Sequence, residues 1–236
     1  GLTIIAFIGS VFSPYYARAR ASAPMGQAEP LEHVAINVAL YGPGGKRWAM
    51  TERSQRHMHR STRELTIGRS SLAWDAGKLQ LSLDEWCLPW PERLRGSVTL
   101  HPLALSACGP LPLDSHGDHH WWPIAPCARV EVDLHGPQGR WQGNGYLDSN
   151  RGRRPLEQTF AHWQWSRAEL PNGGSAVIYD ASEVDATRRQ LALRFGANGS
   201  VDTFDAPPDH VLPLSLWRLP RSQRCEAGQQ PGLVKS

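Results

Sequence analysis

Apolar residues recur at every second position along most of this chain, and this alternation restricts its fold more than any other feature. In KLQLSLDEW, for example, Leu79, Leu81 and Leu83 share one face of an extended chain. A period of two is that of a β-strand with one buried face. Turn-forming residues recur about every ten residues, which is typical of antiparallel sheets. The sequence therefore predicts an all-β fold.

Strands are expected at residues 2–12, 97–101, 140–148, 175–180, 190–195 and 211–217, with a hairpin turn at YGPGGK, residues 41–46. No long amphipathic helix is visible. The segment PLEQTFAHWQWSRAEL has Pro155 at a first-turn position, but Trp163 and Trp165 follow at strand spacing. Only the beginning of this segment is expected to be helical.

A weak internal repeat suggests two β units, because Trp48 and Trp141 each open a strand after a glycine and a basic residue. The predicted domains are residues 1–115, residues 116–221 and a disordered tail at 222–236. The apolar start GLTIIAFIGSVF is interpreted as a buried strand, because no basic residue precedes it and it is too short to span a bilayer. Since the chain starts at Gly1, the first unit is expected to lack its N-terminal strands.

Charge and cysteine content exclude several classes of protein. The net charge of +3 comes from scattered arginines without a basic run, which argues against a nucleic-acid surface. The four cysteines lie far apart with no CxxC pair, so free thiols are expected rather than a zinc site or a disulfide framework.

The segment HGDHHWWPIAP places His116, Asp118, His119 and His120 within five positions, which suggests a metal site. Adjacent histidines on an extended chain point to opposite faces, so only a subset could meet at one ion. No metal site is therefore predicted. A polar turn before a strand stays open as the simpler interpretation.

The segment WQGNGYLDSN contains the most informative carboxyl group. Alternation places Tyr146, Asp148 and Asn150 on one face of a strand. If that face lines an aromatic cavity, burial raises the pKa of Asp148 and keeps a proton available for acid catalysis. Alternatively, Asp148 caps a turn or pairs at the surface with one of the arginines at positions 151, 153 and 154.

Five fragments in this order resemble one known family: GLTIIAFIGSVFSPYY, NVALYG with RWAMTER, WWPIAP, GNGYLDSNRGRRPLEQTFAHWQWSR and LPLSLWR. The chain is similar to the acyclic carotenoid 1,2-hydratases, also called hydroxyneurosporene synthases. The resemblance implies two packed lipocalin-like antiparallel β-barrel units. It also implies a hydro-lyase that adds water to the terminal C1=C2 double bond of neurosporene, lycopene or a related acyclic carotenoid, with no cofactor and no metal.

The resemblance assigns catalytic roles to Asp148, as the acid, and to His119, Trp121 and Tyr146. The predicted substrate-binding residues are Trp122, Asn150, Trp163 and Trp165. Because the substrate is a membrane lipid, peripheral attachment on the cytoplasmic side of the photosynthetic membrane is expected. An aromatic and basic patch of Tyr15, Tyr16, Arg18 and Arg20 would make that contact.

Two other functions stay open. A non-catalytic lipocalin-like carrier of a terpenoid or another lipid would share the scaffold. A terpenoid cyclase would use the same acid but capture the cation with an alkene of the substrate. The sequence leaves the oligomeric state open.

Overall fold

A computed structural model describes residues 1–42, 46–136, 139–214, 218 and 221–229. It is built from antiparallel strands, and the predicted all-β fold of packed antiparallel sheets is confirmed. In the described part of the chain, two short α-helices interrupt the strands, α1 (Pro14–Ser22) and α2 (Leu156–Thr159). Single 3-10 turns lie at Pro24–Gly26, Pro30–Glu32 and Gln55–His57. No helix in these ranges has the length and apolar character needed to cross a membrane.

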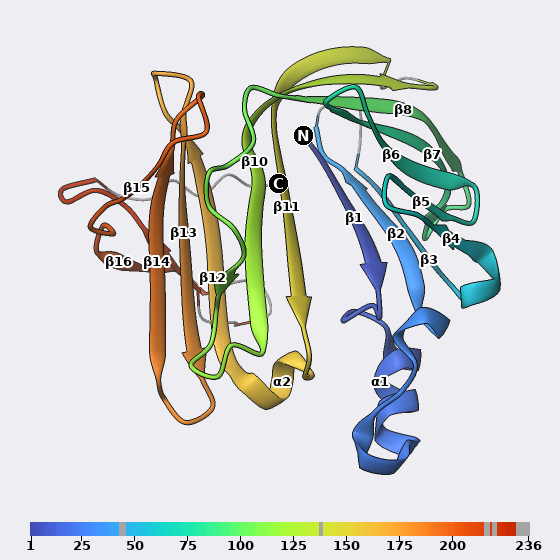
Figure 1. Cartoon of the computed structure of the whole chain (residues 1–236), viewed down its shortest axis with the longest axis horizontal. Helices are drawn as coiled ribbons and strands as arrows, with labels where there is room; N and C mark the ends of the chain where they lie inside the picture. The colour runs from blue at the N-terminus through green and yellow to red at the C-terminus, as the bar shows by residue number, and fades with distance from the viewer. Residues whose placement is uncertain (43–45, 137–138, 215–217, 219–220, 230–236) are drawn as a thin grey trace.

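The larger sheet has eleven strands. They are β1 (Leu2–Ile8), β2 (Val34–Leu40), β3 (Arg47–Arg53), β4 (Met58–Arg60), β5 (Glu64–Ile67), β6 (Ser70–Asp75), β7 (Lys78–Leu88), β8 (Arg93–Pro102), β9 (Leu111–Pro112), β10 (His119–Leu134) and β11 (Arg140–Gly152). Strand β7 joins β3, β6 and β8, and β8 continues the sheet to β10 and β11. The sheet curves around a first core of alternating apolar residues, among them Ile36, Leu83 and Val132 (Figure 1).

A second sheet consists of β12 (Phe160–Glu169), β13 (Ser175–Glu183), β14 (Arg188–Phe195) and β15 (Val201–Thr203). It stands beside β10 and β11 in Figure 1, and side chains from both sheets form a second core that includes Trp121, Phe160 and Phe195. Strand β10 thus contributes to both cores. Its first half packs in the second core, and its last half packs in the first core. Among the described strands, β11 and β12 are edges, each paired with one neighbour only.

The two-stranded sheet of β16 (Asp209–Leu212) and β17 (Arg221–Arg224) contacts the second sheet. Arg224 pairs with Asp180, with Nε 2.6 Å from Oδ2, and Gln164 donates a hydrogen bond to Ser222. Strand β17 includes three residues, 222–224, of the tail predicted to be disordered. Residues 230–236 of that tail lie outside the described residues, as do 43–45 of the predicted turn and 215–217 of the predicted last strand.

Most of the remaining strand predictions agree with the structure. The segment after Pro155 is helical only at α2 and becomes β12 at Phe160, as expected. Helix α1 was not predicted. The Ser13 hydroxyl accepts a hydrogen bond from the Tyr16 backbone N–H, and Pro14 occupies the first turn, so local capping starts this helix. The domain boundary near residue 115 stays a prediction, because β10 packs in both cores.

Candidate active site

Strands β10 and β11 bring Trp121, Tyr146 and Asp148 together. In the antiparallel register Trp121 stands opposite Asn150, and Asp148 stands opposite Pro123. Tyr146 and Asp148 share a face because they are two residues apart, and the Trp121 side chain reaches them diagonally across the strand pair. All three side chains lie on the side of β10 and β11 that contributes to the second core.

Three hydrogen bonds join the members of this triad. The indole N–H of Trp121 can only donate, and it lies 3.1 Å from the Tyr146 hydroxyl and 2.9 Å from Asp148 Oδ2. The Tyr146 hydroxyl donates to the same oxygen, Asp148 Oδ2, at 2.9 Å. Both donors therefore reach Oδ2, while Asp148 Oδ1 has no hydrogen-bond partner among the described residues. As long as both groups donate to Oδ2, the proton of a neutral Asp148 carboxyl group lies on Oδ1.

Aromatic rings surround the triad. The Trp121 side chain is fully buried and packs against Tyr179 and Phe195, with ring centroids 5.7 and 6.4 Å away. The Tyr146 ring lies 5.4 Å from that of Trp165 on the edge strand β12. Asp148 itself is only partly buried, so some of its surface stays accessible. The carboxyl group therefore lies in an apolar environment, and the residue that carries it keeps some accessible surface.

This environment raises the pKa of Asp148, because burial removes the hydration of the carboxylate. The hydrogen bonds from Tyr146 and Trp121 act in the opposite direction and lower the pKa, but burial is the larger effect. Burial also raises the pKa of Tyr146, and together with the nearby Asp148 charge it raises the pKa of Tyr179 to about 12. Both phenols thus remain neutral near pH 7.

The arginines after Asp148 do not neutralise it in the part of the chain that the structure describes. Arg151, Arg153 and Arg154 are exposed, and the Arg154 guanidinium lies 3.8 Å from Asp118 instead. The alternative interpretation, a surface pair between Asp148 and one of these arginines, is therefore wrong. The acid lies on one face of β11, and the arginines lie at its end.

His119 is buried on β10, but it contacts other groups. Its Nδ1 lies 3.4 Å from Asp114 Oδ2, and its Nε2 lies 3.0 Å from the backbone carbonyl oxygen of Arg154. Its ring packs edge-on against Phe160, with centroids 4.9 Å apart. Among the described residues, His119 has no hydrogen bond to the triad.

The predicted substrate-binding residues separate in the structure. Trp165 contacts the triad through Tyr146, and Trp163 lies near Phe160, with ring centroids 6.3 Å apart. Asn150 shares the face of Asp148 but is exposed at the end of the strand. Trp122 is 41% exposed and, by alternation after Trp121, points to the opposite face of the sheet. The structure therefore does not bring Trp122 to the triad.

Sequence reasoning missed three residues near the triad. Tyr179 and Phe195 come from the facing sheet, which no local pattern links to β10. The Arg167 guanidinium lies 5.5 Å from the centre of the Tyr146 ring. Its spacing of two from Trp165 was the available signal, since residues two apart on a strand share a face.

The histidine-rich segment does not gather into a metal centre. Within the described ranges, no group of three or more His, Cys, Asp or Glu side chains is arranged to hold a metal ion. Asp114 instead accepts backbone hydrogen bonds from His116, Asp118 and His119. The four cysteines are free thiols, as predicted.

Comparison with known proteins agrees with the resemblance noted from the sequence. The family model described as carotenoid hydratase CrtC matches residues 4–236. Two proteins named acyclic carotenoid 1,2-hydratase are 49% and 48% identical to this chain, from Thiocapsa roseopersicina and Rubrivivax gelatinosus. Each alignment covers 100% of this chain and 57% of the relative.

A third protein of that name, from Rhodobacter capsulatus, is 39% identical over 99% of this chain and 80% of its own length. No solved structure matches. The chain thus spans a little over half the length of the first two relatives. Because the family model covers nearly the whole chain, the chain belongs to the carotenoid hydratase CrtC family.

Proposed function

We propose that this protein is a carotenoid 1,2-hydratase, a hydro-lyase that adds water to the terminal C1=C2 double bond of an acyclic carotenoid such as neurosporene or lycopene. The observation that supports this most strongly is the partly buried Asp148 carboxyl group, to which Trp121 and Tyr146 donate hydrogen bonds. The names of the relatives support the substrate class.

The first step is proton transfer from Asp148 Oδ1 to the less substituted carbon of the alkene. The C=C electron pair takes the proton, the O–H bond breaks, and a tertiary cation and a carboxylate form. Hydrogen bonds to a charged acceptor are stronger than those to a neutral one, so the Trp121 and Tyr146 donors stabilise the new carboxylate more than the resting acid. The donors therefore lower the barrier rather than merely binding the ground state.

In the second step, water attacks the cation and loses a proton to the Asp148 carboxylate, which restores the acid and yields a tertiary alcohol. Electron-rich rings near the cation stabilise it by about 0.5–2 kcal/mol each. Trp165 and Tyr146 are the nearest candidates. Asp148 makes both proton transfers of the scheme, so the scheme needs no cofactor.

The test is an anaerobic incubation of the purified protein with lycopene or neurosporene, followed by mass analysis of the products. The proposal predicts a product heavier by one water, and none with Asp148→Asn. A new product of unchanged mass would identify a cyclase. Bound but unaltered carotenoid would identify a carrier. Either result would refute the hydratase.

Peripheral contact with the cytoplasmic side of a photosynthetic membrane is part of the proposal. Val11, Phe12 and Tyr15 are 50%, 63% and 70% exposed where α1 begins, and α1 protrudes from the sheets (Figure 1). Arg18 on the same helix is exposed too. Apolar side chains next to basic ones are typical of segments that insert into the surface of an anionic bilayer.

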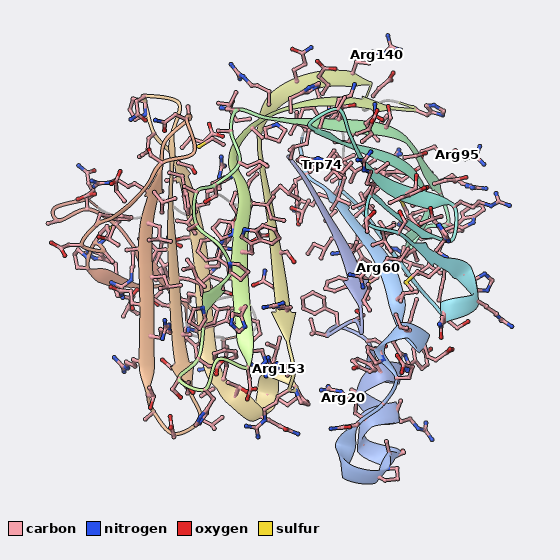
Figure 2. All side chains as sticks on the ribbon, in the orientation of Figure 1. Arg20, Arg60, Trp74, Arg95, Arg140 and Arg153 are labelled. Carbon is pink, nitrogen blue, oxygen red and sulfur yellow. The ribbon has the colours of Figure 1, made fainter. Side chains whose placement is uncertain are left out.

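A salt bridge links this surface to the candidate site. Arg20 of α1 lies 3.1 Å from Glu157 of α2, and α2 connects β11, which carries Asp148, to β12. Figure 2 shows Arg20 and Arg153 toward the same end of the molecule. Membrane contact through α1 would therefore place this end of the site near the lipid.

Co-sedimentation with vesicles of anionic phospholipid tests the contact. The double substitution of Phe12 and Tyr15 by serine should weaken binding. Val211→Ser is the matched control, because Val211 is 89% exposed but lies on β16, away from α1. Equal binding of the parent and the double variant would rule out α1 as the contact.

A further inference from the structure

We infer that His119 is a positioning residue, buried between Asp114 and the Arg154 carbonyl, which fixes the connection from β11 to β12 and leaves both proton transfers to Asp148. The catalytic part of this inference, that Asp148 makes both proton transfers, rests on the proposed hydration. Its structural part concerns residues 152–160 and can be tested without any substrate.

Both ring nitrogens of His119 face groups outside the triad. A backbone carbonyl oxygen only accepts, so Nε2, 3.0 Å from the Arg154 oxygen, must carry a hydrogen and donate it. On the other side, Nδ1 lies 3.4 Å from Asp114 Oδ2 and makes no hydrogen bond. Neither nitrogen faces Asp148, because Nε2 donates to the Arg154 carbonyl oxygen and Nδ1 faces Asp114. Neither therefore reaches a water molecule near Asp148, as a general base would need to do.

Asp114 is itself rigidly held. It is almost fully buried, and its two carboxyl oxygens accept the backbone N–H groups of His116, Asp118 and His119 at 2.9, 3.0 and 2.6 Å. These hydrogen bonds outweigh burial and lower its pKa, so Asp114 is a carboxylate near pH 7. The Asp114 carboxylate is thus fixed by the backbone, and the Nδ1 side of the His119 ring lies against it and not toward Asp148.

The opposite strand provides space for this ring. Gly152 pairs with His119 across β10 and β11, and a Cβ atom at Gly152 would lie 2.6 Å from His119 Cδ2. Glycine at this position therefore lets the imidazole cross β11 and reach the Arg154 carbonyl. A second link runs parallel to it, since the Arg153 backbone N–H donates to the Asp118 carbonyl at 3.0 Å.

The connection held in this way leads directly to the triad. It continues through α2 into β12, where Phe160 packs against the His119 ring and Trp165 packs against Tyr146. A shift at residues 152–154 would therefore move the rings that surround Asp148. With His119 excluded as a base, the proton lost by the attacking water returns to the Asp148 carboxylate, and the cycle balances with one titrating group.

The test compares His119→Gln with His119→Ala. Glutamine keeps an N–H near the position of Nε2 but cannot relay a proton, whereas alanine removes the link to Arg154. We expect kcat of His119→Gln to stay within about threefold of the parent and kcat of His119→Ala to fall by about tenfold or more. His120→Gln is the matched control, because His120 points to the opposite face, and it should leave turnover unchanged.

Hydrogen–deuterium exchange of residues 152–160 is the second readout. Exchange should accelerate in His119→Ala and stay at the parent rate in His119→Gln. Unchanged exchange in folded His119→Ala would overturn the positioning role even if no hydrated product were found. A folded His119→Gln that binds carotenoid but is as inactive as His119→Ala would instead identify His119 as a base. Absence of hydrated product from the parent protein would refute the proposed function alone.

Discussion

Replacing Tyr146 by phenylalanine removes one hydroxyl group from the centre of the site. In the structure this hydroxyl donates to Asp148 Oδ2 at 2.9 Å and accepts from Trp121 at 3.1 Å. A hydrogen bond to a charged group contributes about 1.5–3 kcal/mol. Because the bond strengthens only as the carboxylate forms, its loss raises the barrier of the protonation step. At about 1.4 kcal/mol for each factor of ten, kcat should fall ten- to hundredfold.

The same substitution should move the pH dependence in a defined direction. The Tyr146 hydrogen bond lowers the pKa of Asp148, so its removal lets burial raise that pKa further. In the proposed mechanism the resting protein is active only when Asp148 is protonated. Activity is therefore present below this pKa and lost as the pH rises through it. In Tyr146→Phe the alkaline limb of the rate profile should shift to higher pH although kcat is lower.

The assay is a rate profile against pH with a saturating carotenoid, for the parent and Tyr146→Phe. Exposed Tyr41, replaced by phenylalanine, is the control and should change neither kcat nor the profile. A Tyr146→Phe variant with parental kcat, or with its alkaline limb shifted to lower pH, would refute the assigned role of this hydrogen bond.

Three further predictions follow from the same triad. Asp148→Asn should lose all turnover. Near pH 7 it should also unfold at a higher temperature than the parent, because it removes a carboxyl group that resists ionisation when buried. The melting temperatures of the two proteins should converge below about pH 4, where Asp148 is neutral in both the folded and the unfolded parent. A parent more stable than Asp148→Asn at pH 7 would contradict this. Trp121→Phe should lower kcat, and in urea titrations it should lower the free energy of unfolding by about 1–3 kcal/mol, because a buried indole and its N–H are lost. An unaltered kcat would exclude a role of the Trp121 N–H in the reaction. A strong chelator should leave turnover unchanged. Loss of turnover with the chelator would favour a metal site at the histidine-rich segment.

Local patterns in the sequence were sufficient to predict most strands and the shared face of Tyr146 and Asp148. The same alternation separates Trp121 from Trp122, so it already argued against a common site for these two neighbours. It could not identify Tyr179, because only the packing of the second sheet against β10 brings that residue close to Asp148. Packing between sheets depends on contacts that are distant along the chain.

Helix α1 shows a different limit. None of its side chains with a described position is buried, so it has no apolar stripe from which to predict a helix. The Ser13 cap and Pro14 were the available signals, and both are short-range. The sequence also could not show which groups the arginines at positions 151, 153 and 154 contact, because proximity along the chain does not show on which face of the strand a guanidinium lies.

Infrared difference spectroscopy of the parent protein and Asp148→Asn over a range of pH tests the central claim, an Asp148 pKa raised by burial, most directly. The account predicts that the carbonyl stretching band of a protonated carboxyl group persists in the parent above the pH range usual for an aspartate and is absent from the variant. Loss of this band at or below the pH usual for an aspartate would contradict the account.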